Sequence, residues 1–326
     1  MQSIKIKKND AGQRLDKFLT KAIPTLPMSL MYKYIRTKKI KVNRARTQQN
    51  YVLCEGDEIL LFIREEFFES PEKDRSALYR ITPKLDILYE DEHIMLLNKR
   101  PGVLVHEDTA AAENTLIMHI QAYLAQKGEY DPDEEQSFAP ALCNRIDRNT
   151  GGIVIAAKTA AGLREMNEKI RLDELKKCYL CAVHGKMPKR SDTLRGYLRK
   201  NSSTNTVEVS DTEKRGYKEI ITKYRVLRER DGMSLLEVEL VTGRTHQIRA
   251  HLAHIGHPLV GDGKYGVNRE DRARGYKFQA LYAYRLKFCF EDTSGEIGYL
   301  DQREFRIDLA NVWFLKDFGY REGDAL

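Results

Sequence analysis

One carboxylate stands between two arginines in the segment Asn144-Arg145-Ile146-Asp147-Arg148-Asn149-Thr150-Gly151-Gly152. The segment is rich in turn-forming residues and directly precedes the apolar run 153–157, so we expect a loop at the edge of a strand. An arginine within a few ångströms favours the ionised form of a carboxyl group, and an ionised carboxylate can act as a nucleophile. A salt bridge that merely stabilises a turn would leave the same pattern, and this segment alone favours that explanation.

A second segment that could bind a substrate is Val241-Thr242-Gly243-Arg244-Thr245-His246-Gln247-Ile248-Arg249-Ala250-His251-Leu252. A β-rich run here meets a glycine and then a helix-like stretch. Helix N-termini attract anions, and Arg244 and Arg249 add positive charge. The clustered histidines (His246, His251, His254 and His257) lack the H-E-x-x-H spacing and any accompanying cysteine or carboxylate pattern. We therefore expect anion binding here and no metal site.

Tyr179 lies in a third segment, Lys177-Cys178-Tyr179-Leu180-Cys181-Ala182-Val183-His184-Gly185, whose alternation predicts a strand. A tyrosine on a strand either belongs to the core or offers a ring on which a base can stack, and the segment alone favours the core. Cys178 and Cys181 form a C-x-x-C pair, but it falls inside a strand and no second pair matches it. We expect neither a redox nor a zinc role for it.

Strand-like runs dominate the chain from about residue 84 onward and would have to position these segments. They cover 86–91, 93–99, 151–159, 177–185, 217–229, 233–243 and 281–290, with helical patterns at 114–127 and 160–171. Because strands and helices do not alternate regularly, we expect an α+β domain over 84–326, with a largely antiparallel mixed sheet flanked by helices. Neither a G-x-G-x-x-G nor a P-loop motif is present, so no cofactor is expected.

The first 63 residues predict a separate, small α/β module. Helical spacing over 13–35 is broken by Pro24 and Pro27 into two helices, and 40–43 and 57–63 are strand-like. The module carries 13 Lys and Arg against 5 Asp and Glu, and 21–46 holds eight basic residues and no acidic one. Such a localised field attracts phosphate backbones, which favours nucleic acid over a merely solvated face. A charged linker is expected over 64–83.

Bulk composition narrows the setting. Of the 326 residues, 32% are charged, and no apolar run approaches the ~20 residues that a membrane helix needs. The N-terminus lacks an apolar signal core, and the five scattered cysteines do not suggest a disulfide framework. We expect a cytoplasmic, monomeric protein that binds nucleic acid and no membrane.

Together, these segments resemble the RluA-type family of RNA pseudouridine synthases over most of residues 85–290. Residues 98–106 (NKRPGVLVH) are similar to the family's opening NKPAGLVVH segment, Arg145-Ile146-Asp147 with Thr150-Gly151-Gly152 to its HRLDxxTSG loop, and Lys177-Cys178-Tyr179 to its KxY strand. Residues 243–249, followed by His251-Leu252, Gly261-Asp262 and Tyr265-Gly266, are similar to its long C-terminal motif. Four ordered motifs in one chain make the resemblance specific.

The resemblance implies an isomerase that breaks C1′–N1 of a uridine, rotates the base and forms C1′–C5. Asp147 would attack C1′ or C6, or assist loss of the C2′ proton, and Arg249 would keep it ionised. Tyr179 would stack on the flipped uracil and could take part in proton transfer at C5, Ile248 would pack beneath it and Arg145 would fill the gap left by the base. Arg244 and His246 would bind the RNA substrate.

The N-terminal module is similar to the alpha-L RNA-binding module of ribosomal proteins, through Arg14-Leu15-Asp16-Lys17-Phe18-Leu19, Val42-Asn43 and 56–59. It would bind RNA through basic residues on its second helix and the strand that follows: Lys33, Arg36, Lys38, Lys39 and Lys41. The combination of domains resembles enzymes that act on large-subunit (23S) ribosomal RNA, with transfer RNA as the other candidate.

The chain departs from the family pattern at several positions. Asn144 replaces a histidine, Gly151 a serine, Lys38-Lys39 stand where a glycine is common, and Arg100 precedes Pro101 where Pro-Ala or Pro-Pro is usual. Because of these departures, an inactive RNA-binding or assembly factor of the same fold is an alternative hypothesis. The clustered histidines suggest a second, weaker alternative, a metal hydrolase. The acidic stretch Asp131–Glu135 predicts an exposed loop of unknown role.

Overall fold

The computed structural model describes residues 1–68, 77–105, 115–201, 203–321 and 323–326. The chain divides into two compact units, one of Met1–Lys84 with Ile117–Ala141 and Ala157–Leu163, the other of Leu85–Leu116, Leu142–Ala156 and Arg164–Leu326. Residues 69–76 of the expected linker and His106 of the expected opening motif lie outside the described residues.

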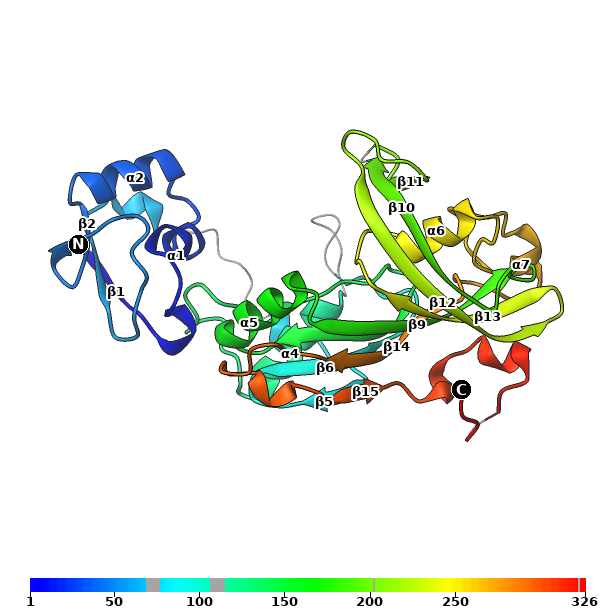
Figure 1. Cartoon of the computed structure of the whole chain (residues 1–326). Coiled ribbons are helices and arrows are strands. Elements are labelled where there is room, and N and C mark those ends of the chain that lie inside the picture. Colours follow the sequence, from blue (N-terminus) through cyan, green and yellow to red (C-terminus); the bar gives the residue numbers. More distant parts are fainter. Residues whose placement is uncertain (69–76, 106–114, 202, 322) are drawn as a thin grey trace. The chain divides into compact units, whose positions relative to one another are not determined.

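A small antiparallel sheet and two helices build the N-terminal part of the first unit, drawn in blue in Figure 1. The helices α1 (Leu15–Ala22) and α2 (Met28–Arg36) end and begin on either side of the two prolines, as predicted. Within the described residues the sheet has the order β1-β4-β2-β3. Its strands are β1 (Gln2–Lys5), β2 (Ile40–Val42), β3 (Ala45–Arg46) and β4 (Glu58–Leu61).

The outer strands β1 and β3 were not expected from the sequence. Each is too short and too polar to show an apolar alternation, and β1 is held by backbone pairing to β4. Behind the sheet, Leu15, Phe18 and Leu19 form a fully buried core with residues of α2. Burying each such side chain stabilises the fold by about 1.5–3 kcal/mol. Phe67 and Phe68 also pack against this core, so ordered structure continues beyond residue 63.

The acidic stretch Asp131–Glu135 contacts the N-terminal part of the same unit. Lys7 Nζ lies 3.1 Å from Glu134 Oε2, and Asn9 Nδ2 donates to Glu135 Oε1 over 2.7 Å. The expected exposed loop is therefore also a docking segment for the N-terminal 3-10 helix η1 (Lys8–Asp10). A second 3-10 helix, η2 (Glu65–Phe67), and the short helix α3 (Ala77–Arg80) follow within the expected linker.

Among the described residues, a second sheet has eleven strands. Nine of them follow the order β11-β10-β12-β13-β9-β14-β8-β6-β5, while β15 pairs with β14 and β7 pairs with β8. The strands from β11 to β14 pair antiparallel with their neighbours, whereas β8 and β14 run parallel. The α+β class is thus confirmed. The strands are β5 (Ile87–Glu90), β6 (Ile94–Lys99), β7 (Ala141–Leu142), β8 (Gly151–Ala157), β9 (Leu175–His184), β10 (Ser191–Asn201), β11 (Thr206–Ser210), β12 (Lys218–Arg230), β13 (Met233–Leu240), β14 (Leu281–Phe288) and β15 (Glu304–Arg306).

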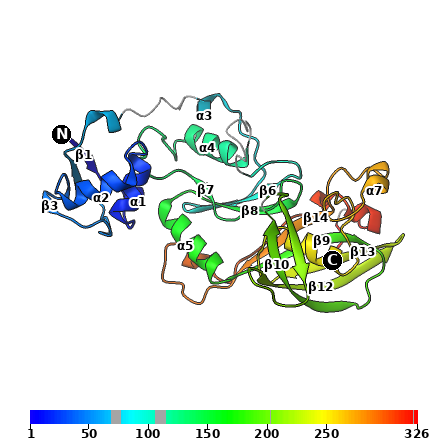
Figure 2. The ribbon, with the colours of Figure 1, turned by 90° about the horizontal axis from the view of Figure 1, so that it is seen from above.

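In the larger sheet, the central strand β8 is covered on both faces, whereas the outer strand β10 is covered on one. Every residue of β8 is buried, which suits a continuous apolar run, while β10 alternates with exposed charges. The expected helices are present as α4 (Leu116–Gln126) and α5 (Ala160–Arg171). The strands β10, β12, β13 and β9 lie side by side in Figure 2.

The helix α6 (Gln247–His254) packs against β10, β11 and β12 and so brings the second predicted segment onto the sheet. Shorter elements complete the C-terminal part: α7 (Arg269–Ala273), η3 (Gly298–Leu300), η4 (Leu309–Asn311) and η5 (Leu315–Phe318). No helix within the described residues is long and apolar enough to cross a membrane.

Candidate active site

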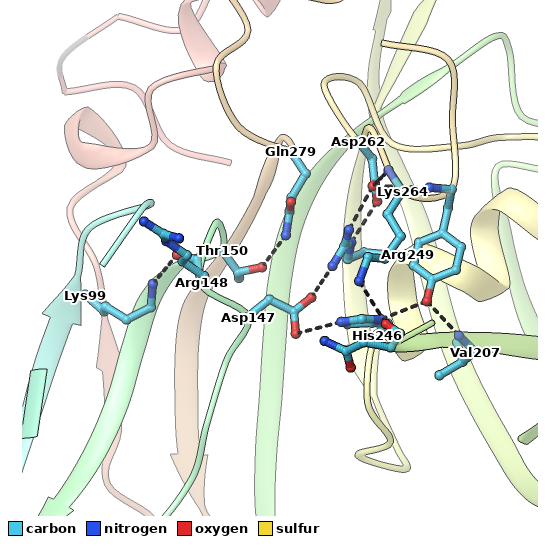
Figure 3. A network of polar contacts seen from close by, with 12 residues as sticks. Lys99, Asp147, Arg148, Thr150, Val207, His246, Arg249, Asp262, Lys264 and Gln279 are labelled. Atoms are coloured by element: carbon cyan, nitrogen blue, oxygen red, sulfur yellow. Dashed lines mark hydrogen bonds and ion pairs between the residues drawn. The ribbon is translucent and has the colours of Figure 1, made fainter. Parts of the chain in front are cut away.

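Asp147 lies in the loop between β7 and β8 and forms an ion pair with Arg249 of α6. Arg249 Nη1 donates to Asp147 Oδ2 over 2.6 Å, and Figure 3 shows the carboxylate between Arg249 and His246. The Asp147 side chain is 25% exposed and that of Arg249 is 8% exposed. The ion pair expected between these two residues is therefore present, and one side of the carboxylate is open to an incoming group.

A second carboxylate, Asp262, holds the Arg249 guanidinium from behind. Arg249 Nε and Nη2 donate to its two oxygens over 2.7 and 2.8 Å, and the Asp262 side chain is fully buried. Burial by itself would lower the pKa of Arg249, but the hydrogen bonds and charges of Asp262 and Asp147 more than offset it and raise that pKa. Two parallel hydrogen bonds to one carboxylate fix the plane of the Arg249 guanidinium. Its third nitrogen, Nη1, is thereby directed at Asp147.

A chain of hydrogen bonds places His246 on the other side of Asp147. The Val207 N–H donates to the Tyr265 hydroxyl oxygen over 2.9 Å, and that hydroxyl lies 2.7 Å from His246 Nδ1. Burial lowers the pKa of His246, partly opposed by the charge of Asp147, which favours a neutral ring near pH 7. If the hydroxyl donates to Nδ1, the ring proton sits on Nε2, which lies 3.8 Å from Asp147 Oδ1.

The His246 backbone has a left-handed conformation, with φ of 53°. For a residue other than glycine this conformation costs about 1–2 kcal/mol. It occurs directly before the first residue of α6, and the His246 ring faces Asp147.

Lys99 at the end of β6 is buried and binds the backbone of the Asp147 loop. Its Nζ donates to the carbonyl oxygens of Arg148, Arg100 and Val103 over 2.8, 3.1 and 3.1 Å. Burial lowers the pKa of Lys99 to about 7, and the negative charge of Asp147 acts in the opposite direction. Gln279 donates to the Thr150 hydroxyl over 3.1 Å on the far side of the same loop. Both contacts hold the part of the loop that follows Asp147.

Tyr179 and Ile248 belong to one apolar cluster on the sheet, and both are more than nine-tenths buried. Burial raises the pKa of Tyr179, and the negative charge of Asp147 raises it further. Tyr179 is therefore a protonated, largely buried phenol. Both the core and the stacking explanations of Tyr179 are compatible with this position.

Two of the departures from the family pattern have a physical explanation. A Cβ at Gly151 would overlap the ring of Tyr282, which packs against this strand and donates to Asn98 Oδ1 over 2.7 Å. Asn144 accepts the Ile155 N–H over 2.8 Å and so fastens the start of the loop to β8. In the N-terminal module, Lys38 has a φ of 61°, the left-handed conformation for which a glycine is the usual choice.

Other predicted site residues are not part of this network. Arg145 and Arg244 are exposed, and within the described residues neither guanidinium has a hydrogen bond or ion pair. The predicted RNA-binding residues of the N-terminal module belong to the other unit, where most are exposed: Lys33, Arg36, Lys38, Lys39 and Lys41. Roles for Asp262, Tyr265 and Lys99 were missed, although each stands in a motif segment, because only their contacts reveal what they do.

The remaining histidines of the second segment have separate partners. His251 Nδ1 lies 3.0 Å from Thr222 Oγ1, His254 Nε2 lies 2.9 Å from Asp211 Oδ1, and His257 Nδ1 bonds a backbone carbonyl. In the portion of the chain that the structure describes, no three His, Cys, Asp or Glu side chains are grouped so that they could hold a metal ion. The five cysteines are free thiols.

Comparison with known proteins identifies the fold first. Two solved human structures, RNA Pseudouridylate Synthase Domain Containing 4 and 1, match with TM-scores of 0.53 and 0.51 at 20% identity, covering 73% and 75% of this chain and 95% and 100% of theirs. The fold is therefore that of pseudouridylate synthases.

The sequence matches are more specific. A family model for RNA pseudouridylate synthase matches residues 93–254. Ribosomal large subunit pseudouridine synthase C of Buchnera aphidicola is 32% identical over 87% of this chain and 88% of its own length, and that of Escherichia coli is 32% identical over 90% of each. The chain belongs to the RluA-type family of RNA pseudouridine synthases, isomerases that convert uridine in RNA to pseudouridine.

Proposed function

We propose that Asp147 is the catalytic nucleophile and that the substrate is large-subunit ribosomal RNA. The observation that carries the first part is the 2.6 Å pair with Arg249, itself held by the buried Asp262. Attack at C1′, attack at C6 and removal of the C2′ proton all require an ionised carboxylate at the same place, next to a flipped nucleotide. The C1′–N1 bond breaks, the C1′–C5 bond forms, C5 loses its proton and N1 gains one, so uridine and pseudouridine are isomers.

The neighbouring groups have separate tasks in this proposal. Tyr179 stacks on the flipped uracil, with Ile248 packed beneath its ring, and takes part in proton transfer at C5. The neutral His246 faces the second oxygen of Asp147 and, together with Tyr265, keeps the carboxylate oriented. Arg145 is exposed and without a partner in the described residues, so it is free to enter the gap left by the extruded base.

Large-subunit ribosomal RNA is favoured over transfer RNA by the relatives, which are named ribosomal large subunit pseudouridine synthase C and are similar over nearly their whole length. The basic residues of the N-terminal module, an alpha-L type RNA-binding domain over residues 1–63, would supply a sequence-independent attraction for the RNA backbone. A catalytic domain over 84–326 would then act in the cytoplasm as a monomer without a cofactor.

Asp147→Asn tests the catalytic role, because the amide keeps the shape of the carboxylate and removes its charge. We expect no pseudouridine in ribosomal RNA transcripts that the unchanged protein modifies, with RNA affinity retained. Asp231→Asn is the matched control: it makes the same change at an exposed turn residue with a φ of 50°. Pseudouridine formed by the Asp147→Asn protein at the normal rate would rule out the assignment.

The substrate is tested by mapping pseudouridine chemically in ribosomal and transfer RNA from cells with and without this gene. We expect at least one site to disappear from large-subunit ribosomal RNA. Loss of a transfer RNA site alone would overturn the ribosomal assignment and leave the catalytic one intact. Unchanged maps in both RNA classes would favour the inactive alternative.

A further inference from the structure

A pocket of about 440 Å³ opens in the second unit at a place that the proposed mechanism does not use. Asp147, Tyr179 and Arg249 are not among its lining residues. Aromatic rings of Phe278, Tyr282 and Trp313 form much of its wall, and Arg100 and Lys277 stand at its edge. Its volume is within the usual range for small-molecule sites, about 300–1,000 Å³.

The aromatic wall is held in place by its surroundings. Tyr282 is buried and hydrogen-bonded to Asn98, while Phe278 lies so close to Gly102 that a Cβ there would come within 3.1 Å of the ring. Trp313 packs edge-to-face against the ring of Tyr276, with 5.2 Å between centroids. Its Nε1 is buried and has no hydrogen-bond partner in the structure. A fixed aromatic wall of this kind suits the flat face of a nucleobase.

The charges at the edge favour a phosphate. Arg100 and Lys277 are both exposed, and neither has an ion-pair partner within the described residues. The single carboxylate of the lining, Asp86, accepts a hydrogen bond from Asn98 Nδ2 over 2.8 Å. The lining therefore contains two cations without an ion-pair partner and one carboxylate that already accepts a hydrogen bond. This excess of positive charge attracts an anion. Base and phosphate together specify a nucleoside phosphate.

The pocket is connected to the catalytic loop, which favours a nucleotide within the RNA over a free one. Gly102 N donates to Arg148 O over 2.9 Å, and Arg148 Nε donates to Gly102 O over 3.1 Å. Tyr282, another lining residue, packs against Gly151, the first residue of β8 directly after that loop. Of the two cations that line the pocket, Arg100 stands two residues before Gly102, at the position that departs from the family's usual sequence before Pro101.

We propose that this pocket binds a nucleotide of the substrate RNA other than the target uridine, its base against Trp313 and Phe278 and its phosphate between Arg100 and Lys277. This inference rests on the chain acting on RNA and is independent of which RNA that is and of the role of Asp147. A flanking nucleotide held here would orient the strand on the same loop that carries the nucleophile.

Trp313 makes the pocket observable, because it is the only tryptophan in the chain. A base that stacks on it should quench its fluorescence. We expect a short single-stranded oligouridylate to quench this signal at low concentrations, both in the unchanged protein and in the Asp147→Asn variant. Uridine 5′-monophosphate should need at least about tenfold more nucleotide for the same effect.

The double variant Arg100→Gln with Lys277→Gln tests the role of the two cations. Lys176→Gln with Lys287→Gln is the control, because it removes the same charge from two residues that lie opposite each other on β9 and β14. We expect the first pair to weaken quenching and RNA affinity about tenfold or more and to lower the salt dependence of binding. The control should change neither quenching nor affinity by more than about twofold.

Three results would overturn the proposal: no quenching by the oligouridylate, equal losses in the two double variants, or quenching by the monophosphate at the same concentrations as by RNA. The last would assign the pocket to a free nucleotide. Failure of the Asp147 proposal would instead appear as activity in the Asp147→Asn protein and would leave the fluorescence result unaffected.

Discussion

The charges around Asp147 and those on the N-terminal module are arranged in opposite ways. Arg249 and Asp262 are buried, paired and held at fixed angles. Lys33 and Arg36 on α2 are exposed and, within the described residues, have no ion-pair partner. Buried pairs are costly to break and little affected by salt, whereas exposed charges act at a distance and are screened.

The difference separates two requirements of an RNA-modifying enzyme. Chemistry needs one carboxylate at a fixed place, and Arg249, itself fixed by two hydrogen bonds to Asp262, holds Asp147 there. Capture of a polyanion needs many weak, long-range attractions, which are useful only if the cations are left unpaired. The pocket at Arg100 combines both arrangements, with fixed aromatic rings and unpaired cations.

Arg249→Lys should cause the largest loss, because one ammonium cannot hold both Asp262 oxygens and also reach Asp147. We expect pseudouridine formation to fall about 100-fold or more, together with a loss of about 2–4 kcal/mol in the free energy of unfolding. Single-turnover kinetics and chemical denaturation measure the two effects. Arg225→Lys, at an ion pair whose arginine is 60% exposed, should change either by little. Equal effects in the two variants would contradict the distinction between buried and exposed charges.

Neutralising the basic face of α2 and the turn after it should have the next largest effect. The variant replaces Lys33, Arg36, Lys38 and Lys39 with glutamine. RNA affinity at low salt should fall about 10–100-fold and the slope of log affinity against log salt should decrease by up to ~3, while the rate at saturating RNA stays unchanged. An unaltered slope would show that this face does not contact RNA. Deleting residues 1–63 is a poorer test, since Lys7 and Asn9 bind the 131–135 stretch.

Lys99 should make stability depend on pH in the alkaline range. Its folded pKa of about 7 lies below the usual value of 10.5, so between these pH values the unfolded chain binds one more proton than the folded one. The free energy of unfolding should therefore rise with pH across this window, by up to about 1.4 kcal/mol per pH unit. Unfolding of the unchanged protein and of Lys99→Met, compared at several pH values, isolates this contribution. Parallel pH profiles would refute it.

Glu135→Gln should give the smallest effect, a slight stabilisation at neutral pH. Burial and the charge of Asp10 raise the pKa of Glu135, although Asn9 opposes the shift, and a buried oxygen on each of the two carboxylates has no partner. Because the pKa of Glu135 is higher in the folded than in the unfolded protein, its contribution to the free energy of unfolding is lost as the pH rises through the folded pKa. The gain should be at most about 1 kcal/mol, measured by thermal unfolding. Glu134→Gln, which only loses an exposed pair with Lys7, should not stabilise; a gain there would contradict the explanation.

Secondary structure was predictable wherever a face of an element is buried. The spacing of Leu15, Phe18 and Leu19 defined α1, and the continuous apolar run of β8 defined a covered strand. The strands β10 and β11 escaped prediction because much of their outward surface is charged, as in the cross-strand pair Arg199–Glu208. Pairing with β12, far along the chain, makes a strand of β10.

The sequence by itself determined the family, the α+β class, the position of Asp147 in a loop before a strand and the concentration of positive charge in residues 1–63. These follow from local patterns and ordered motifs. Only the tertiary structure decided that Asp262 holds Arg249 toward Asp147, that Lys99 supports the same loop, and that Tyr282 requires a glycine at 151. Each depends on side chains brought together from distant segments, and a contact between positions 102 residues apart, such as Asp147 with Arg249, leaves no periodicity in the chain.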